Sequence, residues 1–342
     1  MNSLKPIAKS GRVTIRSVAA DSGVSVAAVS KVLRNAYGVS EALRGRVTQS
    51  IERLGYRPNV AARGMRGQTF TIGVLLVELR NPFLPQIIDG VNAVLGPSNY
   101  KAMIGVGEGN APIETSLIES MIDYRMDGLI LVAPRISGEV LARYGRQIPC
   151  VVTGHHEPTA DAFDTVSGDD RAGGMLAVQS FLARGISDIG MLSLDIDGEK
   201  EVGVIRQREF GFLAAMAAAG LRGEARLFNV SRHARQRTID MLALLNAGNR
   251  PRALFCWSDL DAVDLLSHAR QLGIRVPQDL AIIAYDNSSI AALPLVDLAS
   301  IDQSGPLQGQ QAAKAILSRI EGRTTPHHIL LEPRLVSRRS LE

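Results

Sequence analysis

The chain has 342 residues, of which 46% are hydrophobic and 21% are charged. This length and composition exclude a disordered chain or a single small domain, so we expect two or three domains with a large core. The net charge is only +4, but residues 1–68 contain twelve Lys or Arg against three Asp or Glu, which makes them +9 and leaves the other 274 residues at −5. A basic head on an acidic body indicates nucleic-acid binding, with a solvated charged surface as the alternative.

The two cysteines, Cys150 and Cys256, each lie in an apolar run. Two such thiols do not form a disulfide framework, so the sequence favours a reducing cytoplasm. No apolar run resembles a signal peptide or reaches 18 residues, and we therefore expect a cytoplasmic protein with no membrane partner.

The N-terminal part predicts two short helices joined by a turn. Ile15, Val18 and Ala19 recur at helical spacing, and Gly23 then interrupts the pattern. Ser25 is a favourable N-cap for a second apolar run that extends to Leu33. Two short helices joined by a turn with glycine are typical of a helix-turn-helix, whose second helix enters the major groove of DNA.

The rest of the N-terminal part divides into three segments. Residues 1–11 are predicted to be a flexible basic arm and residues 12–57 an all-α head, with a third helix over 40–54 that stops at Gly55. Residues 58–68 form a basic hinge segment, which is too short to be a stable helix alone in water. We expect DNA to order this segment.

From residue 71 onward, short apolar runs alternate with amphipathic stretches of helical length. The predicted strands are 72–77, 128–132, 150–153, 189–192, 253–256 and 280–284. The clearest predicted helices are 82–95, 171–183, 210–219 and 261–271. Continuous apolar strands that alternate with helices indicate parallel sheets covered on both faces, and their number indicates two lobes. Ligands of such α/β folds bind at the carboxyl ends of the strands.

Several short motifs, in their order and spacing, resemble the lactose-repressor (LacI/GalR) family of bacterial transcription regulators. The most specific are the head at 13–33 and Leu-Gly-Tyr-Arg-Pro-Asn at 54–59. Further matches are Asn-Pro-Phe at 81–83, Asp-Gly-Leu-Ile at 127–130 and Glu-Pro-Arg-Leu-Val at 332–336. The resemblance covers residues 12–340.

The resemblance implies a homodimer whose two heads bind a pseudo-palindromic operator in double-stranded DNA. It also implies a core over 69–342 that is similar to periplasmic sugar-binding proteins, with a small-molecule effector between two lobes. The chain would cross between lobes near Ser167, Ile290 and Thr325. The expected lobes are 69–167 with 291–325, and 168–290 with 326–342. No heptad helix follows the core in this sequence, which favours a dimer over a tetramer.

In the head, the resemblance places Val26 and Ala27 at base-reading positions, where small apolar side chains contact thymine methyl groups. The alternative is that both are core residues. Lys31, one turn further on, is placed to reach a guanine edge or a phosphate. The residues expected to position the phosphate backbone are Thr14, Ser25, Ser30 and Asn35.

The resemblance also places three residues of the hinge segment at the DNA. Met65 matches an apolar wedge that enters the minor groove at a central C-G step. Asn59 and Arg63 are also expected to bind DNA. Gly64 weakens a helix at this place, so we expect a softer hinge.

In the core, Phe83 and Leu84 would form an apolar wall, and the Arg208 fork suits paired hydroxyl groups or a carboxylate. Trp257, the only tryptophan, is either a platform for a sugar ring or a core residue. The other polar residues expected at the effector are Asp169, Ser258, Asp259, Asp286 and Gln303. Asp259 could instead cap the following helix.

The main hypothesis is therefore a repressor whose operator affinity is controlled by an effector. The alternatives are a solute-binding protein of sugar transport and, last, a sugar-processing enzyme, because no nucleophile and base assemble in the sequence. No metal and no cofactor are expected, and the pairs His155-His156 and His327-His328 are predicted to be exposed loop residues. A sugar, a sugar acid, a sugar phosphate or a nucleobase all remain possible effectors.

Overall fold

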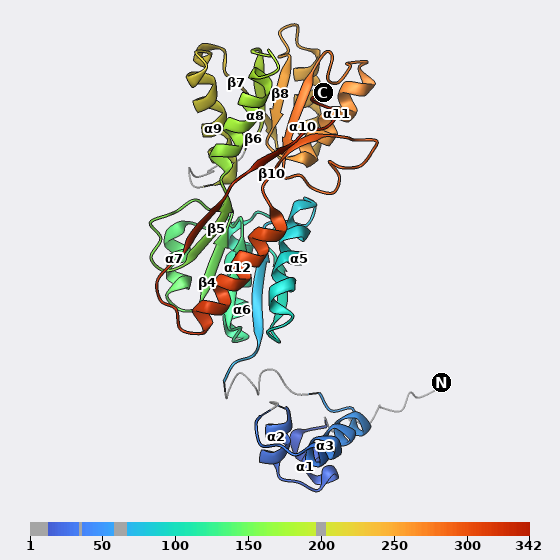
Figure 1. The fold of residues 1–342 in the computed structure, drawn as a ribbon, viewed down its shortest axis with the longest axis vertical. Helices are drawn as coiled ribbons and strands as arrows, with labels where there is room; N and C mark the ends of the chain where they lie inside the picture. Colours follow the sequence, from blue (N-terminus) through green and yellow to red (C-terminus); the bar gives the residue numbers. More distant parts are fainter. Residues whose placement is uncertain (1–12, 34–35, 58–66, 196–202) are drawn as a thin grey trace, which may run out of the picture. The chain divides into compact units, whose positions relative to one another are not determined.

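The computed structural model describes residues 13–33, 36–57, 67–195 and 203–342. The chain divides into two units, Met1–Thr69 and Phe70–Glu342 (Figure 1). The predicted arm and most of the predicted hinge segment lie outside the described residues. Within the described ranges, no helix is long and apolar enough to cross a membrane.

The first unit contains the predicted helices of the head. They are α1 (Ile15–Ser22), α2 (Val26–Leu33) and α3 (Glu41–Leu54). Ser25 and Ser40 accept hydrogen bonds from Ala28 N and Leu43 N at the starts of α2 and α3. Gly23 and Gly55 adopt φ angles of 66° and 63° after α1 and α3, a conformation that glycine adopts without strain. The predicted start and stop signals of the head are confirmed.

The three helices enclose a small apolar core. Val18, Val29 and Val47 come from the three helices and are fully buried against one another. The buried Ser50 hydroxyl donates to Asp21, which links α3 to α1. The head is thus held together by apolar residues of all three helices and by polar contacts of Ser50 and Arg53 in α3 with Asp21 in α1.

The second unit contains two six-stranded sheets (Figure 1). The strands of the first sheet are β1 (Thr71–Leu76), β2 (Lys101–Val106), β3 (Gly128–Val132), β4 (Cys150–Thr153), β5 (Asp164–Gly168) and β11 (His328–Leu331). Those of the second are β6 (Ile189–Asp195), β7 (Arg226–Ser231), β8 (Ala253–Cys256), β9 (Ala281–Tyr285), β10 (Ala299–Asp302) and β12 (Arg334–Val336).

Helices accompany both sheets. Lobe 1, around the first sheet, contains α5 (Phe83–Leu95), α6 (Ala111–Asp123), α7 (Gly138–Gly145) and α12 (Gly305–Ile320). Lobe 2, around the second sheet, contains α8 (Asp170–Leu182), α9 (Val204–Ala218), the short 3-10 helix η1 (Arg222–Glu224), α10 (Ala234–Asn246) and α11 (Asp259–Gln271). The predicted βα pattern and two-lobed α/β architecture are confirmed.

The two sheets have the same order of strands. The order is β2-β1-β3-β4-β5-β11 in lobe 1 and β7-β6-β8-β9-β10-β12 in lobe 2. All these neighbours pair in parallel except β10 and β12. In each lobe the order reverses beside the first strand of the sheet, where α/β folds open a crevice for ligands.

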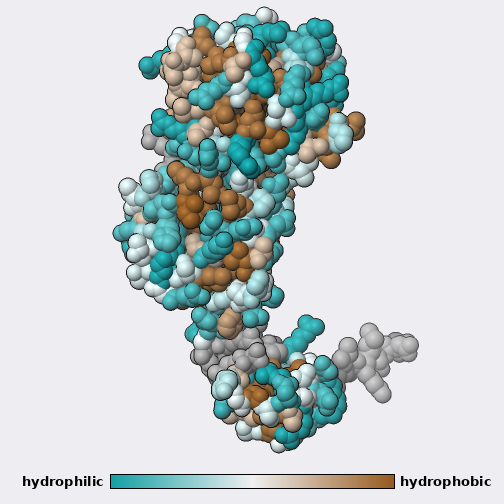
Figure 2. All heavy atoms as spheres, in the orientation of Figure 1, coloured by the Kyte–Doolittle hydropathy of each residue, from teal (hydrophilic) through white to brown (hydrophobic). Residues whose placement is uncertain are grey.

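Each sheet is buried on both faces. Along β1, Val74 packs with α5 and α12, whereas the next residue, Leu75, packs with α6 and α7 on the other face. The alternation of side chains in a strand explains why such a strand is apolar throughout. The outer surface of the core mixes hydrophilic and apolar areas (Figure 2); Met103 and Ile104 on the edge strand β2 are each 51% exposed.

Two of the three predicted crossings between lobes are wrong. The chain leaves lobe 1 after β5, close to the predicted Ser167. It returns between β10 and α12, near Gln303 rather than Ile290, because β10 pairs with β9 of lobe 2. It leaves again between β11 and β12, near Pro333 rather than Thr325, because β11 pairs with β5 of lobe 1. The sequence shows short apolar strands at these places, but not their partners.

Glycines allow the paired helices of each lobe to approach closely. A Cβ atom on Gly309 of α12 would lie 2.0 Å from the carbonyl oxygen of Ile87 in α5. In lobe 2, a Cβ atom on Gly211 of α9 would lie 2.0 Å from the carbonyl oxygen of Arg171 in α8. Since both obstacles are backbone atoms, a side chain at either glycine would push the helices apart.

We predict that Gly309→Ala lowers the free energy of unfolding of the core by about 1–3 kcal/mol, the usual cost of overpacking. Gly248→Ala is the matched control, because nothing lies within 4 Å of its added Cβ atom. Thermal and urea unfolding of the full chain would measure both. Equal stabilities of the two variants would contradict the proposed backbone contact.

Candidate functional site

The candidate effector site is a cavity of about 570 Å³ at the carboxyl ends of both sheets. Lobe 1 contributes Val77, after β1, and Thr153, at the end of β4. Lobe 2 contributes Leu194 from β6 and Trp257, after β8. The volume is in the range of small-molecule sites, which are mostly apolar with a few polar groups.

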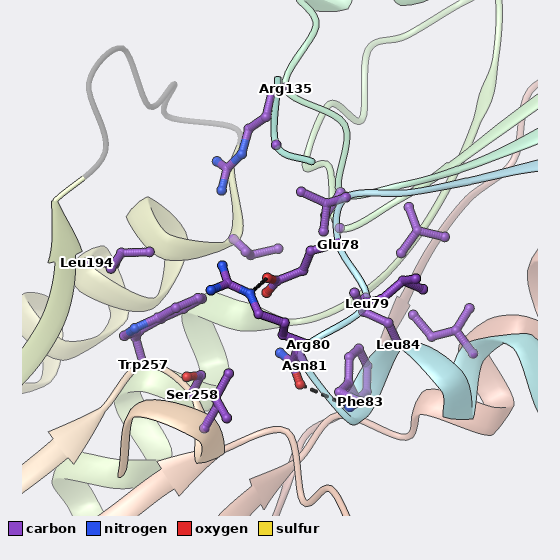
Figure 3. Close-up of a pocket in the computed structure, with 18 of the residues that line it drawn as sticks. Glu78, Leu79, Arg80, Asn81, Phe83, Leu84, Arg135, Leu194, Trp257 and Ser258 are labelled. Carbon is purple, nitrogen blue, oxygen red and sulfur yellow. Dashed lines mark hydrogen bonds and ion pairs between the residues drawn. The ribbon is translucent and has the colours of Figure 1, made fainter. Parts of the chain in front are cut away.

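Five of the nine residues expected at the effector line this cavity: Phe83, Leu84, Trp257, Ser258 and Gln303. Phe83 and Leu84 begin α5 and lie on the wall opposite Trp257 (Figure 3). Ser258 is also the N-cap of α11, since its hydroxyl accepts from Asp261 N at 3.2 Å. Phe83, Leu84 and Trp257 thus contribute two rings and a leucine to the apolar part of the wall, together with aliphatic residues such as Val77 and Leu194.

Arg208 does not line the cavity, because its guanidinium is buried with its charge already paired. Its side chain is 3% exposed and donates from Nε to Asp170 at 2.7 Å. The same guanidinium donates to the Trp257 carbonyl oxygen and stacks 3.7 Å from the centre of the Tyr285 ring. The residue expected to bind the effector directly is therefore directed at groups of the protein itself.

Asp286 also lies behind the lining. It follows β9 directly and is 2% exposed, with Oδ1 at 3.8 Å from Arg208. Its two oxygens accept from Gln303 Nε2 at 2.6 Å and from Asn81 Nδ2 at 3.0 Å. Its φ angle of 113° is rare for a side-chain-bearing residue. Such backbone strain is often found at functional sites.

Asp170 is held from the other side by a histidine. His156, between β4 and β5, has Nε2 at 2.7 Å from Asp170 Oδ2. The predicted exposure of the pair His155-His156 is wrong: His155 is 4% exposed and contacts Glu157 at 2.7 Å. His328, also expected in an exposed loop, is part of β11 and lies 2.9 Å from the Thr165 hydroxyl.

We call Asn81, His156, Asp170, Arg208, Asp286 and Gln303 the clasp. Asn81 and His156 belong to lobe 1, whereas Asp170, Arg208 and Asp286 belong to lobe 2. The contacts between Asn81 and Asp286 and between His156 and Asp170 therefore join the lobes beside the cavity.

His156 and Asp170 were not among the site residues predicted from the sequence, and Asn81 was predicted only as part of a motif. Asp170 stands beside the expected Asp169, which is the only signal that could have suggested it.

The charges of the clasp depend on one another. Burial raises the pKa of Asp170, but Arg208 and His156 outweigh burial and hold this pKa below its ordinary value. Burial by itself lowers the pKa of Arg208, but the charges of Asp170 and Asp286 raise this pKa by more. The pKa of Arg208 therefore lies above its ordinary value. For Asp286, burial prevails over Arg208 and raises the pKa to about 7. The clasp therefore holds one firmly ionised carboxylate and one that titrates near neutral pH.

Asp169 and Asp259 have roles inside lobe 2. Asp169 caps α8 by accepting from Ala172 N at 2.9 Å. Asp259 is fully buried and accepts from Ser288 N at 2.7 Å and from the Ser300 hydroxyl at 2.6 Å. It does not cap α11, because Ser258 does, so the alternative prediction for Asp259 is wrong. Neither residue lines the cavity.

The charged side chains that do line the cavity come from loops and from α10 and α11. They are Arg80, Arg135, Arg232 and Arg237 with Glu78, Glu108 and Asp261. Arg80 lies 3.3 Å from Glu78, and Arg237 lies 3.3 Å from Asp261. Figure 3 shows Arg80 and Arg135 directed into the cavity on the side that faces Trp257. No sequence pattern marked Arg80, Arg135 or Arg232, because loop residues have no periodicity.

The head supplies the candidate DNA interface. Ala27 and Lys31 are exposed on α2, whereas Val26 is partly buried against the head core. Thr14 and Ser25 are exposed, and their hydroxyls cap α1 and α2. Ser30 is half-buried on α2. The other residues expected at DNA, Asn35, Asn59, Arg63 and Met65, lie outside the described residues. The roles of all these residues at DNA stay predictions.

The described ranges contain no group of three or more His, Cys, Asp or Glu side chains that could hold a metal ion.

Two family models match the chain. The model of bacterial regulatory proteins of the lacI family matches residues 14–59, and a periplasmic binding protein-like domain matches residues 178–341. The chain is 30% identical over 333 residues to the HTH-type transcriptional repressor PurR of Escherichia coli, with 96% of each chain covered.

Solved structures give the same result. A complex of the transcriptional regulator CelR with cellobiose is 26% identical, with a TM-score of 0.68 over 96% of this chain and 100% of that chain. The lac repressor dimer bound to operator and the anti-inducer ONPF shares the fold at 21% identity, with a TM-score of 0.83 over 97% and 100% of the chains. The chain therefore belongs to the lacI family of bacterial regulatory proteins, and it is a DNA-binding transcription regulator rather than a solute-binding protein of transport.

Proposed function

We propose that this regulator is a cytoplasmic repressor whose operator affinity is controlled by a small effector bound in the cavity between the lobes. The observation that carries the proposal is that one cavity is lined by loops of both lobes. A ligand there contacts both lobes at once, so its binding favours one arrangement of the lobes over others. No catalytic step is part of this function.

The clasp supports this form of control. It joins the lobes through side chains directly behind the lining, and Gln303 belongs both to the clasp and to the lining. An effector that contacts Gln303 or Trp257 therefore acts on groups that bond to Asp286 or Arg208. The resulting change in operator affinity can be no larger than the difference in effector affinity between the two arrangements.

We propose that the chain binds its operator as a homodimer. The recognition helix α2 has eight residues and a length of about 12 Å, which spans about three to four base pairs. A site this short does not distinguish an operator from the rest of a genome. Two heads on a pseudo-palindrome double the length of the sequence that is read.

We propose a sugar or sugar derivative as the effector. Trp257 and Phe83 offer ring faces in the cavity, and aromatic rings pack well against the apolar faces of sugars. The related regulator CelR forms a complex with cellobiose, which supports a carbohydrate for this chain as well.

Selection of genomic DNA fragments by the full chain, at a stated near-physiological salt concentration, tests the function. We expect enrichment of a pseudo-palindrome of two half-sites with a central C-G step, and release of the fragments by an effector. Lys31→Ala should weaken operator binding about tenfold or more, because Lys31 is exposed on α2 and available to DNA. Lys101→Ala, an exposed lysine of the core, is the matched control.

The pattern of the loss on Lys31→Ala identifies its contact. A loss confined to one operator position indicates a base contact, whereas an equal loss on random DNA with a lower salt slope indicates a phosphate contact. Unchanged affinity of Lys31→Ala would remove this residue from the interface. Absence of any enriched fragment, with and without bacterial small-molecule extract, would overturn the repressor function itself.

We predict that the free energy of unfolding of the core falls as pH rises from 5 to 7, because Asp286 of the clasp titrates in this range. The pKa of Asp286 is about 7 in the folded chain and about 3.9 when unfolded, so folding takes up a proton in this range. The contribution of this group is complete below pH 4 and is lost as pH rises to 7, at about 1 kcal/mol per pH unit. Burial raises the pKa of Asp259 to about 6, and because its charge acts on Asp286 the two carboxyls share this titration.

Thermal unfolding of the full chain between pH 5 and pH 8 measures this slope. Asp286→Asn should reduce this slope, because one of the two titrating carboxyls is gone while one oxygen still accepts a hydrogen bond. Asp297→Asn is the control; Asp297 follows the turn after β9 and is not part of the clasp. A slope of unchanged size in Asp286→Asn would assign the titration elsewhere.

A further inference from the structure

We propose that Thr153 and Gln308 form a subsite of lobe 1 that binds a hydroxyl group of the effector, so that these two residues select a polyhydroxylated ligand. This inference rests on the proposed function, since it concerns the ligand of the same cavity. It depends on where the two side chains lie in lobe 1 and on a buried hydroxyl group for which the described residues supply no hydrogen-bond partner.

Thr153 occupies a position of the first sheet whose neighbours are apolar. It ends β4 and pairs with Val132 of β3 and with Val166 of β5. Residues that pair in register lie on the same face of a sheet, and both valines pack in the cluster that α5 and α12 cover. Valine has nearly the shape of threonine and differs mainly by the hydroxyl group. Packing alone therefore does not account for a hydroxyl group at this place.

The hydroxyl group of Thr153 is buried at the cavity without a partner. The residue lines the cavity and is 1% exposed. Its Oγ1 has no hydrogen-bond partner among the described residues. A buried polar group normally has a partner, because leaving it without one is costly. A ligand in the cavity would supply the missing hydrogen bond.

The surroundings of Thr153 favour a neutral group of the ligand at this place. Phe83, Leu84 and Val132 line the cavity and are buried in the same apolar cluster of lobe 1. Burying a charge among apolar side chains costs more than a hydrogen bond to one hydroxyl group compensates. A hydroxyl, ether or carbonyl oxygen is therefore a better match for Thr153 than a carboxylate or a phosphate.

Gln308 narrows this choice to a hydroxyl group. It lines the cavity, is 2% exposed and lies one turn before Ala312 of α12, which belongs to the same apolar cluster. Residues one turn apart share a face of a helix, so Gln308 lies over the same face of the sheet as Thr153. Its Nε2 donates to the Gln303 carbonyl oxygen at 2.7 Å and to Gln303 Oε1 at 3.2 Å, which turns its own Oε1, an acceptor, away from Gln303. A hydroxyl group can donate to this acceptor, whereas an ether or carbonyl oxygen cannot.

Gln308 also connects the subsite to the clasp. Gln303, which accepts from Gln308, donates from Nε2 to Asp286 at 2.6 Å. A ligand hydroxyl group that contacts Gln308 therefore acts on the side chain that holds Asp286 of lobe 2. The subsite thus offers a route from the ligand to the contacts that join the lobes.

Thermal unfolding of the full chain tests the state of the Thr153 hydroxyl group before any ligand is added. Thr153→Val removes a hydroxyl group without a partner, so we expect the midpoint temperature of unfolding to stay equal or to rise. Thr165→Val is the matched control, because Thr165 is a buried threonine of the same sheet, lies outside the lining and hydrogen-bonds to His328 Nδ1 at 2.9 Å. Its midpoint should fall by about 2 °C or more. A fall of the same size in Thr153→Val would overturn the subsite, because Thr153 would then have a partner within the protein.

Operator binding tests the contact with the ligand. The operator fragment that the full chain selects is labelled, and its anisotropy is recorded while a bacterial small-molecule extract is added in a dilution series. We expect Thr153→Val to need about three to ten times more extract than the unchanged chain, the cost of one neutral hydrogen bond. Thr153→Ser, which keeps the hydroxyl group, should need less extract than Thr153→Val, and Thr165→Val should respond like the unchanged chain. Treatment of the extract with periodate, which cleaves between neighbouring hydroxyl-bearing carbons, should abolish its effect.

The outcomes separate the subsite from the repressor function. An unchanged response of Thr153→Val, or an extract that keeps its effect after periodate, would overturn the subsite and leave the repressor function intact. An extract that does not alter operator binding by the unchanged chain would instead contradict effector control itself, and the subsite with it.

Discussion

The buried charge of Arg208 is the constraint on which the arrangement of the core depends. A guanidinium that is 3% exposed is tolerated only if carboxylates and carbonyl oxygens surround it. Asp170, Asp286 and the Trp257 carbonyl oxygen meet this requirement inside lobe 2. Those carboxylates need further donors, and His156 and Asn81 of lobe 1 reach them. One buried charge in lobe 2 thus determines which polar groups join the two lobes.

The two lobes have the same architecture, and this similarity places the groups of the clasp opposite one another. Both sheets have the same strand order, and in both the glycine-lined contact of two helices brings the helices close. The carboxyl ends of both sets of parallel strands line one cavity, so every loop that follows a strand is a candidate for ligand contact. The clasp lies at this junction, behind Trp257, and its member Gln303 also lines the cavity.

This geometry separates two kinds of polar group. Those of the clasp are buried and mutually satisfied, and they control how the lobes are held. Those of the lining, among them Thr153 and Ser258, border the cavity itself, and Asn81 and Gln303 belong to both groups. A substitution of Arg208 would leave Asp170 and Asp286 without their charge partner, so it would change stability as well as effector binding. Substitution of a lining residue outside the clasp, such as Thr153, tests ligand binding more directly.

The sequence by itself determined the local structure and the family. Helix caps such as Ser25 and Gly55, the apolar strands and the order of the motifs depend on neighbouring residues, and the structure confirms them. The lobe to which β10 and β11 belong was not predictable, because a short apolar strand does not specify its partner. The clasp was equally inaccessible: Asn81 and Asp286 are 205 residues apart, and only tertiary packing buries them together. Capping and periodicity are local properties, whereas burial and charge pairing are decided by residues that meet only in the folded chain.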